Sequence, residues 1–167
     1  MKLTLTIPIL AGLLSMTGCA TLFSTDAFVK DEEAIVDPYL AGTWTNEGDT
    51  LVVRLDGRVY DVTYLDRGNE PVRFTGRMTR IGEALLLDLA RVTDDPFVMP
   101  LHFAVRVWPE DRTLRWTMVD GEWAKEQAAS LGARREGERT IVTGDVLRRF
   151  AGYERALGKV ETWVRER

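Results

Sequence analysis

The stretch TLVVRLDGRVYDVTY, residues 50–64, decides the fold of this chain. Two short runs rich in β-branched and aromatic residues flank Asp56-Gly57, a pair typical of a two-residue type I′ hairpin turn. In the second run, every second position carries a large apolar side chain, at Tyr60, Val62 and Tyr64. This period of two places those side chains on one face of a strand. The stretch therefore predicts two antiparallel strands that share one buried face.

The same alternation continues through the middle of the chain. The apolar face of the later runs carries Val72, Phe74, Met78, Leu85, Leu87, Leu89, Leu101, Phe103, Val105, Val107, Leu114, Trp116 and Met118. Short connections join most of these runs, and residues 92–100 form a longer loop. Closing consecutive antiparallel strands into a barrel buries their apolar faces together and removes exposed edges. We therefore expect a mainly β fold, an antiparallel up-and-down meander closed as a barrel of about eight strands.

Two segments have helical patterns. Residues 120–132 begin with Asp, contain good helix formers and end with Gly, which predicts a short helix. Residues 145–164 repeat apolar residues at helical spacing, which predicts a C-terminal amphipathic helix that packs on the barrel. Residues 140–143 predict one more strand. Trp123 and Trp163 are expected to anchor the two helices to the core.

The beginning of the chain, MKLTLTIPILAGLLSMTGC, has the pattern of a secretory leader. Lys2 gives it a positive start, residues 3–14 are mostly apolar, and small or uncharged residues precede Cys19. An apolar run of about a dozen residues is too short to span a bilayer as a helix. We therefore expect residues 1–18 to be a signal peptide that is cleaved after Gly18.

The end of this leader resembles the lipobox of bacterial lipoproteins, in which Gly or Ala precedes a cysteine. Gly18 and Cys19 match that pattern, whereas Met16 stands where the family usually has Leu. The resemblance implies that Cys19 is the lipidated first residue of the mature chain. Ala20, in place of Asp, favours the outer membrane, with the domain facing the periplasm. The alternative is a plain secretory signal with a chance cysteine.

Composition limits what the mature domain does. Loss of Lys2 with the leader changes the formal charge from −4 to −5, and a mildly acidic domain is poorly suited to bind nucleic acid. Cys19 is the only cysteine, so the domain has no intramolecular disulfide and depends on its core. Residues 19–38 mix polar and charged residues, which predicts a lipidated N-terminus and a partly ordered tether. A few apolar residues in this segment offer the alternative that it docks on the domain.

Gly42-Thr43-Trp44 lies just before the first predicted hairpin. Residues 39–167 resemble the loose lipocalin-like group of bacterial envelope lipoproteins, which carry Gly-x-Trp at the start of the first barrel strand. The resemblance implies that Gly42 and Trp44 mark one end of the barrel, and that its interior holds a small ligand. The alternation brings candidate ligand contacts to one interior: Tyr60, Phe74, Leu87, Phe103 and Trp116. A barrel filled by its own side chains is an equal alternative.

The reactive side chains favour a protein that is not an enzyme and needs no cofactor or metal. His102 is the only histidine, which excludes a His pair for zinc, and we expect it to be a structural residue. Ser130 lies in the predicted helix 120–132 without the Gly-x-Ser-x-Gly pattern of a nucleophile elbow. Cys19 is expected to carry lipid. No serine, cysteine or histidine site for catalysis is therefore predicted.

The acidic residues do not alter that expectation. Asp88, Asp94 and Asp95 lack the regular ligand spacing of a calcium loop. Asp61 and Asp88 would be a carboxylate pair for glycoside hydrolysis only if the fold brought them together.

The sequence thus predicts an envelope lipoprotein that binds a small apolar or amphipathic ligand and contacts the membrane through its lipid anchor. The alternative is a structural lipoprotein with a filled barrel that binds an envelope protein partner.

Overall fold

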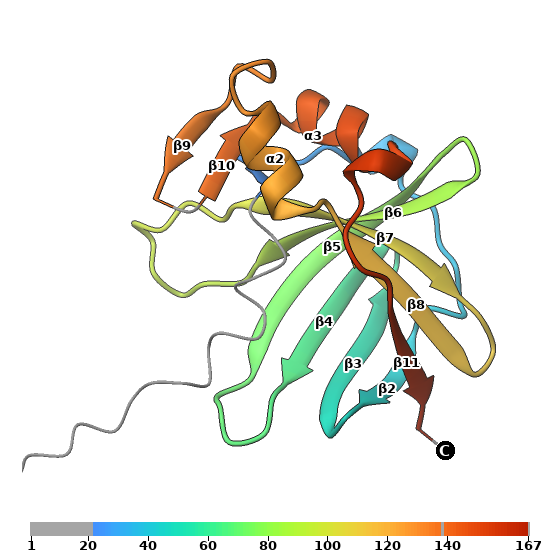
Figure 1. Cartoon of the computed structure of the whole chain (residues 1–167). Coiled ribbons are helices and arrows are strands. Elements are labelled where there is room, and N and C mark those ends of the chain that lie inside the picture. The colour runs from blue at the N-terminus through green and yellow to red at the C-terminus, as the bar shows by residue number, and fades with distance from the viewer. Residues whose placement is uncertain (1–21, 138, 167) are drawn as a thin grey trace, which may run out of the picture.

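The computed structural model describes residues 22–137 and 139–166, and Gly18 and Cys19 lie outside them. Eight strands form a closed antiparallel barrel (Figure 1). They are β2 (Gly42–Asn46), β3 (Asp49–Asp56), β4 (Val59–Leu65), β5 (Val72–Ile81), β6 (Ala84–Arg91), β7 (His102–Pro109), β8 (Thr113–Met118) and β11 (Glu161–Arg165). Each strand pairs with the next in this order, and β11 also pairs with β2. The predicted mainly β barrel is confirmed.

The hairpin that decides the fold forms at its predicted position. Leu55 pairs with Tyr60 across β3 and β4, and Asp56 pairs with Val59 beside the turn. Gly57 has a φ of 59°, in the left-handed region that glycine enters without steric cost. The local turn chemistry therefore sets the register between β3 and β4.

The predicted C-terminal helix over residues 145–164 is wrong beyond its first two turns. Helix α3 (Gly144–Ala151) is followed by a short 3₁₀ helix, η2 (Glu154–Ala156), and the chain then becomes strand β11. Trp163 is buried in the barrel core rather than on a helix. Residues 161–165 form a strand despite the helical spacing, because β8 and β2 each need a partner for their backbone hydrogen bonds.

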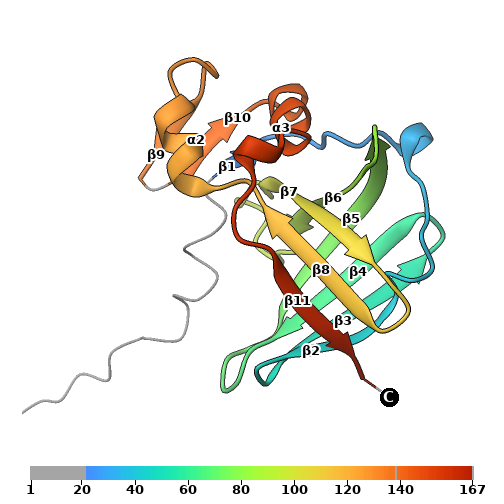
Figure 2. The ribbon, with the colours of Figure 1, turned by 45° about the vertical axis from the view of Figure 1, so that its right-hand side comes forward.

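The remaining elements form a small layer beside the barrel (Figure 2). The predicted helix over 120–132 is confirmed in a shorter form as α2 (Gly121–Gln127), and Asp120 accepts a hydrogen bond from the Trp123 amide at 2.8 Å. The strand predicted over 140–143 is β10 (Arg139–Val142). It pairs with β9 (Arg134–Glu136) and, in parallel, with β1 (Leu22–Ser24).

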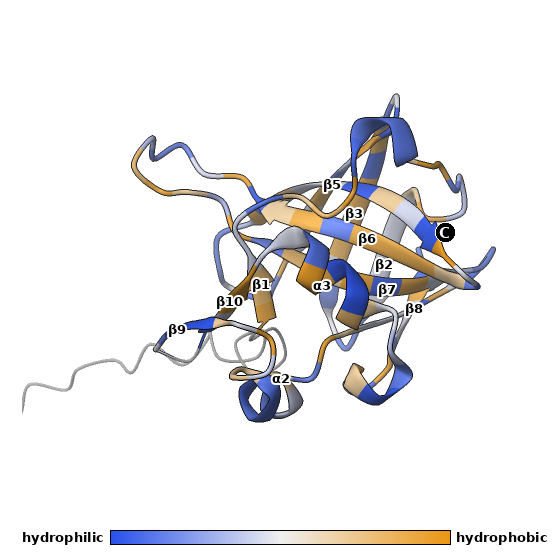
Figure 3. Cartoon of the chain, turned by 90° about the horizontal axis from the view of Figure 1, so that it is seen from above, coloured by the Kyte–Doolittle hydropathy of each residue, from blue (hydrophilic) through white to orange (hydrophobic). Residues whose placement is uncertain are grey.

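The segment predicted to be a tether is packed on the barrel from Leu22 onward, so the docking alternative is right for the described residues. Phe28, Val29 and Ala34 are buried, on either side of a 3₁₀ helix, η1 (Asp31–Glu33). With α3, they form a second core on the outer face of β6 and β7. Figure 3 shows β1 and α3 lying over this side of the barrel.

Asp88 holds this N-terminal segment in place. Its side chain is 3 % exposed, and one carboxylate oxygen accepts hydrogen bonds from the amides of Phe28 and Val29 at 2.8 and 3.2 Å. The other oxygen lies 2.7 Å from Nδ1 of His102. His102, expected from the sequence to be a structural residue, therefore contacts the carboxylate that holds the N-terminal segment.

Helix α3 also holds the N-terminal segment. Arg148 donates hydrogen bonds to the carbonyl oxygen of Phe28 at 3.2 Å and to the carboxylate of Glu33. The Arg148 hydrogen bond lowers the pKa of Glu33 below its ordinary value. The N-terminal segment is thus held from the barrel side and from the helix side.

We predict that Asp88→Ala lowers the free energy of unfolding by about 2–4 kcal/mol, because it leaves two buried amides without an acceptor. Hydrogen exchange should accelerate first at Phe28 and Val29, while the barrel strands remain protected. Asp94→Ala, which removes an exposed carboxylate from a loop, is the control. Unchanged exchange at Phe28 in Asp88→Ala would show that other contacts hold the segment.

Candidate functional site

The inward-facing side chains of the barrel strands form one apolar core. Its buried members are Leu40, Trp44, Val53, Tyr60, Val62, Tyr64, Met78, Leu87, Leu89, Val105, Val107, Leu114, Met118 and Trp163. Partly buried residues complete it: Ile35, Leu51, Leu55, Phe74, Leu85, Phe103 and Trp116. All the predicted ligand contacts belong to this core, so the alternation assigns their faces correctly. That they touch a ligand stays a prediction.

One end of the barrel, which we call the closed end, is sealed around Trp44. The Trp44 indole is fully buried and donates a hydrogen bond to the carbonyl oxygen of Leu40 at 3.0 Å. The guanidinium of Arg165 lies 4.2 Å from the centroid of the Trp44 ring. It also donates to the carbonyl oxygens of Tyr39, Ala41 and Asp111 at 2.6, 2.9 and 2.7 Å.

The Arg165 contact explains Gly42. A Cβ atom at this position would lie 2.3 Å from Nη1 of Arg165, closer than any real contact of that kind. Glycine therefore lets the guanidinium reach Trp44 and the neighbouring carbonyl oxygens. Sequence reasoning missed Arg165 because it assigned residues 145–164 to a helix. A strand over these residues would place Trp163 and Arg165 on the same inward face, and this alternation was the available signal.

Tyr60 belongs to the closed end. Its hydroxyl oxygen accepts a hydrogen bond from the Asp37 amide at 2.8 Å and donates to the Asp37 carbonyl oxygen at 3.3 Å. Burial raises the pKa of Tyr60, so its phenol stays neutral. Tyr60, one of the predicted ligand contacts, therefore holds the N-terminal segment on the barrel, and it lies away from the other aromatic candidates.

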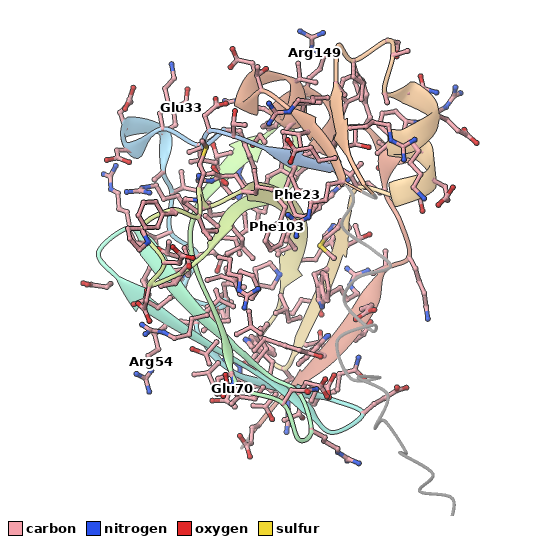
Figure 4. All side chains as sticks on the ribbon, turned by 90° about the vertical axis from the view of Figure 1, so that its left-hand side faces the viewer. Phe23, Glu33, Arg54, Glu70, Phe103 and Arg149 are labelled. Carbon is pink, nitrogen blue, oxygen red and sulfur yellow. The ribbon has the colours of Figure 1, made fainter. Side chains whose placement is uncertain are left out.

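The opposite end, which we call the loop end, carries the connections that follow β2, β4, β6 and β8. Phe74 and Phe103 lie here, with ring centroids 5.6 Å apart in an edge-to-face arrangement. Phe23 of β1 adds a third ring, 6.3 Å from Phe103 (Figure 4). Both Phe74 and Phe103 are partly exposed. The structure thus brings together two of the predicted contacts at the rim of the barrel.

Two tryptophans on neighbouring strands place polar N–H groups in the apolar interior. Trp116 of β8 and Trp163 of β11 both belong to the barrel core, and the Nε1 atom of each is buried without a hydrogen-bond partner among the described residues. A buried donor left unpaired costs about 1–3 kcal/mol. Each of these indole N–H groups therefore lacks an acceptor that an oxygen atom of a ligand would supply.

Tyr64 lies beside Trp163, and the centroids of the two rings are 6.3 Å apart. Its hydroxyl donates a hydrogen bond to Asp49 at 2.6 Å. Burial, together with the nearby carboxylates of Asp49, Asp66 and Glu161, raises the pKa of Tyr64. Tyr64 is therefore a neutral donor whose proton is already bound to Asp49, whereas the indole N–H groups of Trp116 and Trp163 have no acceptor among the described residues.

The candidate acidic residues do not converge. Asp61 is exposed on β4, whereas Asp88 is buried on β6 beneath the N-terminal segment, and strand β5 separates them. Asp94 and Asp95 are exposed in the loop between β6 and β7. Within residues 22–137 and 139–166, no group of three or more His, Cys, Asp or Glu side chains is placed to hold a metal ion.

Comparison with known proteins adds no relative. No protein family model, no curated protein and no solved structure matches this chain. In the part of the chain that the structure describes, no helix is long and apolar enough to cross a membrane. The class is therefore set by architecture: an eight-stranded antiparallel barrel, sealed at one end by a tryptophan–arginine pair.

We predict that Arg165→Met lowers the free energy of unfolding by about 2–4 kcal/mol, because it removes three hydrogen bonds and the contact with the Trp44 ring. Arg165→Lys should recover only part of this loss, since an ammonium group lacks the planar fork that reaches three carbonyl oxygens. Chemical denaturation monitored by tryptophan fluorescence measures both, with exposed Arg54→Met as the control. Full recovery by lysine would contradict the assigned geometry.

Proposed function

We propose that this protein is a lipid-anchored binding protein of the bacterial cell envelope, which holds a small amphipathic molecule inside its barrel. The observation that carries the proposal is the pair of indole N–H groups of Trp116 and Trp163, which have no partner among the described residues and lie in an otherwise apolar interior. Buried donors normally have partners. An oxygen acceptor on a ligand, such as a carbonyl, carboxylate or phosphate oxygen, satisfies both.

The rest of the interior suits an apolar chain. Leu87 lies within the core, and Phe74 and Phe103 border the loop end. Each Å² of apolar ligand surface that is buried there contributes about 25 cal/mol. A ligand with one oxygen-bearing group and one apolar chain therefore matches the two kinds of surface that the barrel offers.

The closed end supports the proposed lipocalin-like character. Gly-x-Trp in that family implies a tryptophan that seals one end of the barrel, and Trp44 has this position with Arg165 stacked over it. Ligand binding from the loop end is the arrangement that this geometry favours.

The proposed location rests on the leader and on Cys19. The pattern of residues 1–19 supports cleavage after Gly18 and attachment of diacylglycerol to the Cys19 thiol, with the domain in the periplasm. Two or three acyl chains give stable anchoring, at about 0.8 kcal/mol per buried CH₂.

A second candidate function is a structural lipoprotein with a filled barrel that contacts an envelope protein. The observation in its favour is the dense packing toward the closed end. Trp44, Tyr60, Met78 and Leu114 are all 2 % exposed or less. If such packing fills the whole interior, no ligand enters.

We predict that the protein binds a fluorescent polyene fatty acid, and that Trp116→Phe/Trp163→Phe weakens this binding about 5- to 100-fold, because two hydrogen bonds are lost. Binding of an apolar dye without an oxygen acceptor should change much less. Trp108→Phe is the matched control, since Trp108 contacts Arg106 and Arg115 rather than the core.

The same titration, together with native mass spectrometry, separates the two candidate functions. Native mass spectrometry of protein extracted from membranes should show a retained amphiphile, and retention should fall in the double variant. Absence of both a retained molecule and fatty acid binding would instead support the filled barrel. Equal loss of fatty acid and of the dye without an acceptor would contradict the role of the indoles.

We also predict that Cys19→Ser abolishes metabolic labelling with palmitate and releases the protein from the membrane fraction, because the Cys19 sulfur is the proposed attachment atom. Ala20→Ser, one residue further on, should leave labelling intact. Labelled palmitate in the Cys19→Ser protein would contradict the proposed anchor.

A further inference from the structure

The connection between β6 and β7 carries an unusual group of exposed apolar side chains. Phe97 is 95 % exposed, Met99 66 % and Val98 50 %, and we call residues 92–100 the apolar loop. Single exposed apolar residues are common, but a contiguous group of this size marks a contact with a partner or a lipid surface.

Local hydrogen bonds give the apolar loop its shape. The Phe97 amide donates to the Asp95 side chain at 2.9 Å, and the Val98 amide donates to the Asp95 carbonyl oxygen at 3.2 Å. The Asp95 amide in turn donates to Oγ1 of Thr93 at 3.1 Å. The turn therefore presents Phe97 outward instead of folding it back on the barrel rim.

The anchor lies close to this loop, an argument that rests on the proposed lipidation of Cys19. Because the N-terminal segment is docked from Leu22, only three peptide units join Cys19 to the described domain. At about 3.3–3.6 Å per residue, they span at most about 11 Å. Whatever conformation they adopt, the bilayer surface lies near β1.

The start of β1 and the root of the apolar loop are neighbours. Ser24 pairs with His102, the first residue of β7 after the loop, and Phe23 contacts Phe103. The apolar loop and the beginning of the described chain lie on the same side of the molecule in Figure 1, and Figure 3 agrees. Figure 4 faces this side, with Phe23 and Phe103 near its middle.

Cations flank the same region. Arg139 of β10 lies 6.0 Å from the centroid of the Phe23 ring, and Arg134 and Arg135 are exposed on β9, the next strand. Guanidinium groups at this position suit the phosphates of lipid headgroups. An apolar projection, exposed arginines and a short link to the lipid anchor thus meet on one side.

We propose that the apolar loop inserts Phe97, Val98 and Met99 into the surface of the bilayer that holds Cys19. Insertion removes their apolar side chains from water, and the lipid anchor keeps the loop at the membrane at high effective concentration. The loop end of the barrel then faces the bilayer. An amphipathic ligand passes between the membrane and the rim formed by Phe74 and Phe103 without crossing bulk water.

The test uses the full-length lipoprotein in vesicles of phosphatidylethanolamine with a minority of phosphatidylglycerol. Phe97→Cys is labelled with an environment-sensitive fluorophore, and it is the only free thiol because Cys19 carries lipid. The emission should shift to the blue and be quenched by nitroxides on the acyl chains. Val164→Cys is the matched control, since Val164 is 53 % exposed on β11, whose C-terminal end lies far from the loop in Figures 1 and 3.

A further substitution tests the apolar contacts themselves. Met99→Asp in the Phe97→Cys background should reduce acyl-chain quenching to the level of the Val164→Cys control. Quenching that survives Met99→Asp would overturn apolar insertion.

The mass of the same sample separates the two proposals. If Cys19 lacks the diacylglyceryl group, the proposed anchor fails and the loop proposal fails with it. If Cys19 is lipidated but the label at position 97 reports water, only the loop proposal fails. A blue shift without acyl-chain quenching indicates a protein contact and also overturns membrane insertion.

Discussion

The constraint on which this structure depends is that every barrel strand needs two hydrogen-bonding neighbours. β8 and β2 are far apart in the sequence, and β11 fills the position between them. Its inward residues then contribute to both ends of the interior that the proposed function involves. Arg165 seals the closed end against Trp44, and Trp163 contributes one of the two unpaired indole donors. Barrel closure and the proposed ligand contact are thus properties of the same short strand.

The docked N-terminal segment gives the domain an orientation. If residues 22–38 were a free tether, Cys19 would say little about which surface meets the membrane. Asp88 and Arg148 hold the segment on the outer face of β6 and β7, so only a short link to the proposed anchor remains. The barrel rim, the apolar loop and the arginines of β9 and β10 are then on the proposed membrane side. The structural role of Asp88 therefore bears directly on function.

The features that the sequence predicted are those determined by near neighbours. Alternation assigned Phe74, Leu87 and Trp116 to the interior, and Asp56-Gly57 placed the hairpin. The errors concern contacts between distant residues. The docking of Phe28 depends on Asp88, 60 residues away, and strand β11 forms because of edges that the local helical spacing does not reveal. The unpaired state of the two indoles follows from three-dimensional packing, so no sequence pattern predicted it.

The most direct test of the central claim is an NMR measurement of the indole N–H resonances during titration with a fatty acid. Assignment by single Trp→Phe variants identifies each tryptophan. We predict that the Trp116 and Trp163 resonances move downfield on binding, as new hydrogen bonds form, while the resonance of Trp44, whose indole already donates to Leu40, stays in place. Saturable binding that leaves Trp116 and Trp163 unchanged would contradict it.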